Sequence, residues 1–144
     1  MGTWGSGPLD SDTAEDCLEE LEDMSPQERK TVIEATFRSV REGGGQPSSA
    51  VLPEEVIAAA TVVAANTPAG RAISWHKDYP IAEWLPKPLG IDLPAKAMEA
   101  LEAAVSPEGY YWRGWVNPRD GLEARESIDN ILAILRSERS RSAH

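Results

Sequence analysis

Three aspartates near the start of the chain, Asp10, Asp12 and Asp16, have the side-chain type and close spacing that a hard divalent cation selects. The residues around them do not complete an EF-hand loop, because its central glycine and its distal bidentate glutamate are both missing. Asp12 has a simpler interpretation as the N-cap of a helix that carries Glu15 at its third position. We therefore predict no metal site here.

The side chains best suited to acid–base or nucleophilic chemistry are His76 and Cys17. His76 lies between Trp75 and Lys77 with Asp78 nearby, but no partner nucleophile is evident, so we interpret it as a surface or interface histidine. Cys17 falls on the apolar face of an acidic helix, which should raise its pKa and suppress thiolate chemistry. We interpret Cys17 as a core residue and predict no catalytic residues, no cofactor and no enzymatic activity.

An aromatic run from Tyr110 to Trp115 has the composition of a stacking platform for bases or sugars. A nucleic acid is disfavoured as the partner, because the net charge of −10 would repel its phosphate backbone. The run can instead pack among helices, or it can contact a small molecule or peptide. For the second interpretation we predict a ligand groove lined by Trp75, Trp84, Tyr111 and Trp112.

The clearest functional signal is an uneven distribution of charge. Residues 1–28 contain nine acidic residues and no lysine or arginine, whereas the rest of the chain has 15 acidic against 14 basic residues. This segment is either a solvated face that promotes solubility or an electrostatic docking surface for a basic protein. For the docking interpretation, the predicted partner-binding residues are Asp16, Glu19, Glu20 and Asp23.

Length and composition fit a single globular domain. The chain has 144 residues, of which 41% are hydrophobic and 26% charged. It contains no apolar run of the ~18 residues that a membrane span needs and no secretory signal pattern, so we expect a cytoplasmic protein without a membrane partner. We expect a monomer in which residues 1–137 form one helical domain and residues 138–144 a flexible polar tail.

Apolar periodicity predicts an all-α fold, a compact bundle of about five amphipathic helices with an irregular connection rich in tryptophan and proline. The second helix has a clear start signal, because Ser25 and Glu28 form a capping box around Pro26. The third helix has Thr61 as its single polar side chain between Val56 and Ala65, which predicts a buried centre. The predicted helices span residues 13–24, 26–42, 53–65, 94–105 and 122–136, with a short helix within 81–85.

The opening segment Met1-Gly-Thr-Trp-Gly-Ser-Gly7 is followed by Asp10, Asp12, Ala14 and Asp16. This pattern resembles the Met-Gly-x-Trp-Gly-x-Gly signature of a bacterial domain-of-unknown-function family, number 4259. The family also has an alanine-rich central helix, a late aromatic segment and a terminal amphipathic helix, which look like residues 56–65, 112–116 and 122–136. Leu9 and Cys17 depart from the bulkier residues expected there. The resemblance implies a fold and no catalytic residue, and we expect Trp4 to be buried against the first or last helix.

We therefore predict a non-catalytic interaction protein that binds a basic protein through its acidic first helix. An immunity or antitoxin-like inhibitor is the specific form that the small size and the acidic face suit. The alternative is a small-molecule-binding or accessory protein that uses the Trp/Tyr-rich region as a pocket. An enzyme ranks third, because each general acid or base lacks a partner at suitable spacing.

Overall fold

The fold is a bundle of helices, and in the computed structural model it is described for residues 12–43, 53–67, 70, 81–85, 92–104 and 118–142. These residues contain five α-helices, one short 3-10 helix and no strand, which confirms the predicted all-α fold. None of the helices in these ranges is long and apolar enough to cross a membrane. The elements are α1 (Asp12–Glu22), α2 (Pro26–Gly43), α3 (Pro53–Ala65), η1 (Ile81–Glu83), α4 (Asp92–Ala104) and α5 (Pro118–Ser142).

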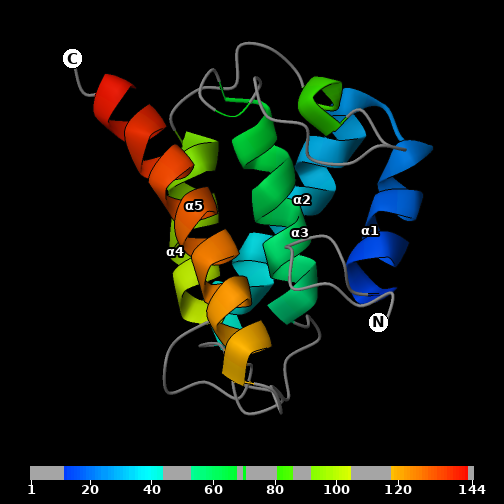
Figure 1. The fold of residues 1–144 in the computed structure, drawn as a ribbon. Coiled ribbons are helices and arrows are strands. Elements are labelled where there is room, and N and C mark those ends of the chain that lie inside the picture. The colour runs from blue at the N-terminus through cyan, green and yellow to red at the C-terminus, as the bar shows by residue number, and fades with distance from the viewer. Residues whose placement is uncertain are drawn as a thin grey trace.

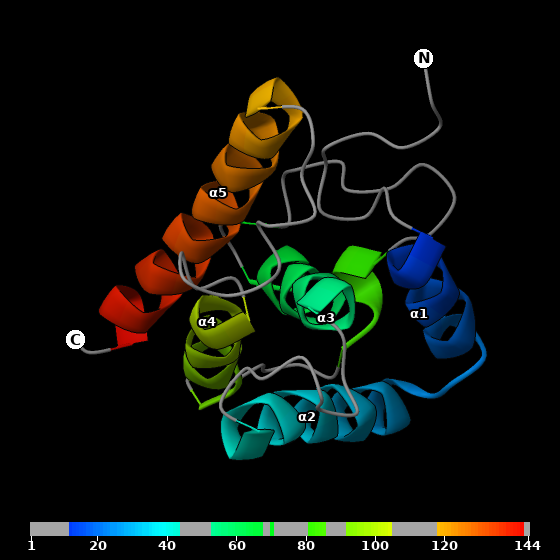
Figure 2. The ribbon, with the colours of Figure 1, turned by 90° about the horizontal axis from the view of Figure 1, so that it is seen from below.

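Helix α3 lies at the centre of the bundle, with the other helices arranged around it (Figure 1; Figure 2). It contacts α1, α2, α4, α5 and η1. Every side chain from Val56 to Thr67 is buried, which confirms the predicted buried centre. Alanines and valines dominate this helix, and such small side chains allow neighbouring helices to approach closely on all sides.

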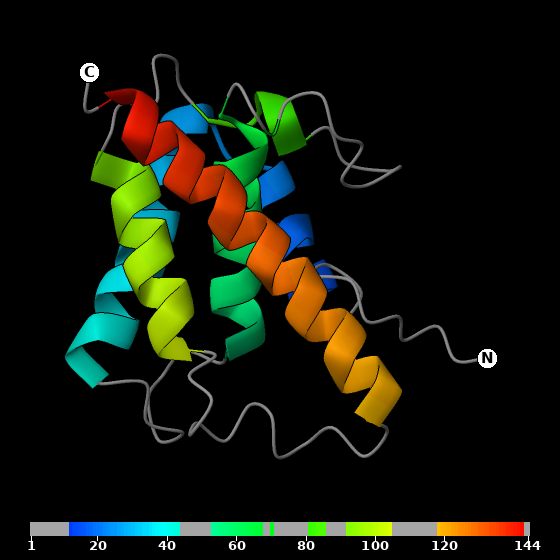
Figure 3. The ribbon, with the colours of Figure 1, turned by 60° about the vertical axis from the view of Figure 1, so that its left-hand side comes forward.

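Each outer helix contributes an apolar stripe that faces α3. Helix α5 crosses α4 and α3 obliquely (Figure 3) and packs against both. Most described side chains of the stripes predicted from periodicity are buried, whereas Cys17 on α1 and Leu132 on α5 are partly buried. Their buried members are Ala14, Leu18 and Leu21 on α1, Ile33, Phe37 and Val40 on α2, Ala97, Met98 and Leu101 on α4, and Ile128, Ile131 and Leu135 on α5.

The predicted ends of the helices differ most for α5, which spans Pro118–Ser142 instead of residues 122–136. The apolar repeat that led to the prediction marks the part of the helix that packs on the core. A helix continues past such a repeat wherever polar residues of good helix propensity follow, as the Ser-Glu-Arg stretch does here. The helix therefore enters the predicted polar tail.

Helix α2 begins with the capping box expected from the sequence. The backbone N–H of Glu28 donates to Ser25 Oγ at 3.2 Å, and the N–H of Ser25 donates to Glu28 Oε1 at 3.0 Å. The bond from the Ser25 N–H favours the charged carboxylate and, together with the Ser25 hydroxyl, lowers the pKa of Glu28 from its ordinary value. The reciprocal bonds satisfy two backbone donors at the start of the helix and fix the short turn between α1 and α2.

The side chain of Arg29 joins three elements and is called here the Arg29 clamp. Its Nε donates to the carbonyl of Leu21 at 2.7 Å and its Nη2 to that of Glu22 at 2.9 Å, both at the C-terminal end of α1. Its Nη1 donates to the carbonyl of Trp84 at 3.2 Å, and its guanidinium lies over the Trp84 ring, 4.8 Å from the centroid. The clamp thus satisfies helix-terminal carbonyls and places a cation at the negative end of the α1 dipole.

Asn66 makes a second connection, between the end of α3 and η1. Its Nδ2 donates to the carbonyls of Val62 and Ile81, both at 2.7 Å, and its Oδ1 accepts from the N–H of Leu85 at 3.2 Å. These bonds are buried, so the amide is fully used inside the protein. Asn66 and Arg29 together tie the segment from Ile81 to Leu85 to the bundle.

The chain turns away from α3 at Gly70, whose N–H donates to the carbonyl and to the hydroxyl of Thr67, each at 3.1 Å. A Cβ added at Gly70 would overlap the backbone carbonyl of Ala64. This close approach of two backbone segments explains the glycine that the sequence places just after α3.

Replacing Arg29 with alanine should lower the free energy of unfolding by about 2 to 3 kcal/mol, because three carbonyls lose charge-assisted hydrogen bonds and Trp84 loses its cation. Urea unfolding followed by circular dichroism measures this. Arg38→Ala, which removes an exposed arginine from the same helix, is the control and should change stability by no more than about 0.5 kcal/mol. Equal losses for the two variants would contradict the clamp.

An ordinary substitution destabilises a protein by about 0.5 to 3 kcal/mol. Gly70→Ala should cost more than this, because the new methyl group overlaps backbone rather than a movable side chain. The expected result is a much lower melting temperature or no cooperative transition in differential scanning calorimetry. A melting temperature within a few degrees of the wild type would contradict the prediction, because it would show that the turn after α3 can move to admit the methyl group.

Candidate functional site

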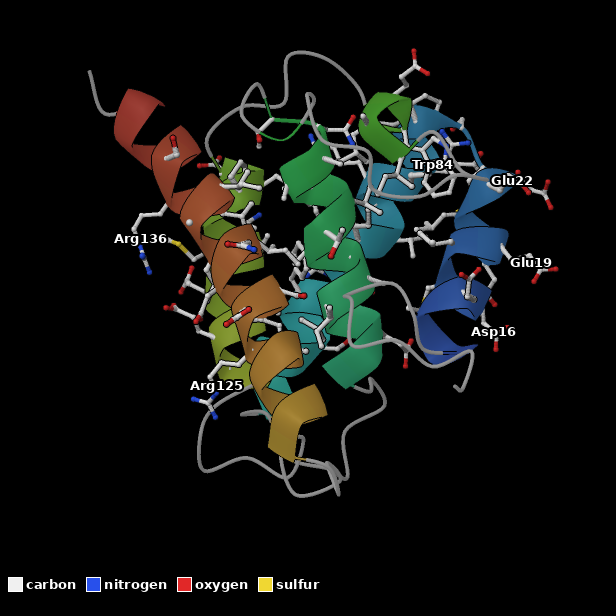
Figure 4. All side chains as sticks on the ribbon, in the orientation of Figure 1. Asp16, Glu19, Glu22, Trp84, Arg125 and Arg136 are labelled. Atoms are coloured by element: carbon white, nitrogen blue, oxygen red, sulfur yellow. The ribbon has the colours of Figure 1, made fainter. Side chains whose placement is uncertain are left out.

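The outward side of α1 and the turn that follows it carry a row of carboxylates, called here the acidic face. The side chains of Asp16, Glu19, Glu20 and Asp23 are all exposed. In Figure 4 the labelled Asp16 and Glu19 point away from the bundle, while the inner side of α1 is buried against it. The structure therefore places Asp16, Glu19 and Glu20 on α1 and Asp23 in the turn directly after it.

Charges of the same sign are neighbours along this face. Asp16 is three residues before Glu19 and four before Glu20, and Glu19 is four before Asp23, so each carboxylate lies about one helical turn from another. In the part of the chain that the structure describes, no ion pair involves any of these four carboxylates; Lys96 and Glu34 form an ion pair elsewhere, at 3.9 Å. Among the described residues, the repulsion between these carboxylates is therefore reduced by solvent and counterions and not by a basic side chain.

Two arginines of α5 lie far from the acidic face. Figure 4 shows the labelled Arg125 and Arg136 on the opposite side of the bundle from α1. Helix α1 itself contains no basic residue. The charged side chains that α1 offers to a partner are therefore all acidic.

A small pocket lies beside the acidic face, where α1, α2 and α3 meet, and is called here the Cys17 pocket. Its volume is about 60 Å³. Its lining includes Cys17 and Glu20 from α1, Val32 and Thr36 from α2, and Glu55 and Ala59 from α3. Sequence reasoning missed this pocket because each helix contributes a few ordinary residues, and only the packing of three helices brings them together.

Cys17 is half-buried at this pocket, so the prediction that it is a core residue is corrected. Burial raises the pKa of its thiol to about 11, and the carboxylates of Glu55, Glu20 and Asp16 contribute in the same direction. The expected direction of the shift is therefore confirmed. The thiol stays protonated at neutral pH, which makes Cys17 a weak nucleophile there.

Trp84 is the one member of the predicted ligand groove that lies among the described residues. It is 4% exposed, and Arg29 covers one face of its ring, so its observed role is structural. Trp75, Tyr111 and Trp112 lie outside the described residues, as do Trp4, His76 and Asp10. The ligand groove and the burial of Trp4 therefore stay predictions.

The described residues contain no group of three or more histidine, cysteine, aspartate or glutamate side chains that could hold a metal ion. Of the three aspartates considered for a cation, the structure describes the side chain of Asp16 alone. Asp16 lies on the exposed acidic face and faces solvent.

Alkylation of Cys17 should be slow at neutral pH and should keep accelerating above pH 9. A pKa of about 11 in place of 9.0 lowers the thiolate population about 100-fold at neutral pH. Mass spectrometry of iodoacetamide labelling against pH measures this, with the urea-unfolded protein as the control that levels off near the ordinary value. A native profile that levels off near pH 9 would contradict the described setting of Cys17.

Comparison with known proteins finds one family. The sequence model of the family described as Domain of unknown function (DUF4259) matches residues 2–127. Neither a search of curated proteins nor a search of solved structures finds a match. The matched range includes α1 to α4 and the first part of α5, and therefore both the acidic face and the Cys17 pocket.

Proposed function

Since this chain belongs to the DUF4259 family, whose description assigns no activity, we propose its function from its surface: it binds a basic protein through the acidic face of α1. One observation carries the proposal. Asp16, Glu19 and Glu20 are exposed on a helix without a basic residue, together with Asp23 in the turn after it, and no ion pair within the described residues neutralises them. A cationic partner would relieve their mutual repulsion.

The size of the attraction indicates which step of binding it affects. A unit positive charge about 10 Å from four carboxylates gains roughly 1.7 kcal/mol in water at low ionic strength. At physiological salt, a Debye length of about 8 Å reduces this energy to roughly a third. The acidic face is therefore expected to speed the approach of a partner more than to prolong the complex.

The structure also supports a rigid presentation of the acidic face. Helix α1 is attached to the bundle by the buried side chains of Ala14, Leu18 and Leu21, and its end is held by the Arg29 clamp. A surface that is ordered before binding loses little conformational entropy in the complex. An immunity or antitoxin-like inhibitor is the specific case in which the basic partner is an enzyme and α1 covers its active site.

Reversing two charges should weaken binding without unfolding the protein. For a basic partner isolated from the native host, Glu19→Lys with Asp23→Lys should reduce the association rate constant by about tenfold or more and flatten its dependence on salt. Surface plasmon resonance at several salt concentrations measures both quantities, and circular dichroism checks the fold.

The matched control is Glu99→Lys with Glu102→Lys, which makes the same change in net charge at two exposed positions of α4. Helix α4 lies on the other side of α3 from α1 (Figure 2). The control should retain most of the wild-type association rate. If the two double variants slow association equally, the acidic face acts only through its contribution to the net charge. If neither variant changes the association rate, the proposal is refuted.

A further inference from the structure

The Cys17 pocket combines an apolar interior with acidic groups beside it. Leu21, Ile33 and Ala59 supply buried apolar surface, while Val32, at 40%, is the one large hydrophobic side chain that is exposed among the described residues. Glu20 and Glu55 also line the pocket. An occupant that satisfies both parts must be apolar along its length and positively charged at one end.

We propose that the Cys17 pocket takes a single lysine side chain of the basic partner, with the lysine's aliphatic stem inside and its ammonium group between Glu20 and Glu55. This inference rests on the proposed function, and it assigns an anchoring position within that interface. Lysine buries its methylenes along apolar surface while its charged end stays with polar partners, so its chemistry matches the lining.

The volume of the pocket agrees with this occupant. A void needs about 15 Å³ to hold one water-sized group, so about 60 Å³ has room for roughly four such groups in a row. The stem of lysine has four methylenes.

Electrostatics select the cation. The pKa of the Cys17 thiol is raised first by burial and then by the charges of Glu55, Glu20 and Asp16, so the field of three carboxylates reaches this side of the pocket. The hydroxyl of Thr36 donates to the Val32 carbonyl at 3.0 Å, which leaves its lone pairs to accept a bond from an ammonium group.

Other occupants are less suitable. An anionic group would be repelled by the carboxylates, and the same repulsion opposes a second copy of this chain, whose α1 is equally acidic. A leucine would fill the apolar interior but would remove water from the carboxylate of Glu20 without supplying a positive charge, which is costly.

The test uses n-butylammonium as the probe, because it reproduces the lysine stem and its charge without requiring the partner. Two-dimensional ¹H–¹⁵N NMR of the full chain should show saturable shifts at Cys17, Thr36 and Ala59, with a dissociation constant in the millimolar range expected of so small a ligand. n-Butanol and ammonium chloride, which carry the stem and the charge separately, should each bind at least about fivefold more weakly.

Glu20→Gln with Glu55→Gln should weaken butylammonium binding at least about fivefold, whereas Glu19→Gln with Asp23→Gln, which removes the same charge from the acidic face outside the pocket, should change it less than about twofold. Glu20→Gln alone, at an exposed position, serves if the first variant does not fold and should weaken binding at least about twofold. Absence of saturable shifts, equal binding of n-butanol, or equal effects of the paired variants would overturn the assignment.

The two proposals fail separately. If butylammonium binds as described but the charge reversals at Glu19 and Asp23 leave the association with a physiological partner unchanged, the pocket stands and the acidic face does not. If the reversals slow association but butylammonium does not bind, the docking surface stands and the anchoring lysine is wrong.

Discussion

The guanidinium group of Arg29 is the interaction on which the arrangement of the acidic side of the molecule depends. It comes from the first turn of α2, binds two carbonyls at the end of α1 and one at Trp84, and lies over the Trp84 ring. Burial lowers the pKa of Arg29 from its ordinary value, but the group stays charged under any physiological condition. Helix α1 contains no basic residue of its own, so Arg29 supplies the positive charge at its end. The orientation of the acidic face therefore depends on Arg29, which takes no part in that face, as well as on the buried side chains of α1.

The fold could be predicted from the sequence to the extent that local signals agree with packing. The capping box at Ser25 and Glu28, the apolar repeat of Ile33, Phe37 and Val40, and the nearly all-apolar Val56–Ala65 segment each led to the observed element. Helix ends were less predictable, as α5 shows, because polar residues carry little information about where a solvent-exposed helix stops. Periodicity marks burial rather than helical length.

The candidate site also has a part that could be predicted from the sequence and a part that could not. The acidic face could be predicted because its residues are close together in sequence, on one helix and the turn directly after it. The Cys17 pocket could not, since Cys17, Val32 and Glu55 become neighbours only through the crossing of three helices. Cys17 itself shows the difference, because its place in the apolar repeat of α1 indicated full burial, whereas the junction with α2 and α3 leaves it half-buried. The structural role of Trp84 could not be predicted either, since its cation partner Arg29 is 55 residues away in sequence.

The central position of α3 has a consequence for how the protein is made. The helix is covered on all sides, yet α4 and α5, which cover much of it, follow it in the chain. During synthesis α3 leaves the ribosome before these helices exist, and the valines and alanines that α4 and α5 cover stay exposed until both helices have followed. An isolated helix of 13 residues is also marginal in water. The bundle is therefore expected to close only once α5 has been synthesised, with the nascent chain dependent until then on protection from aggregation.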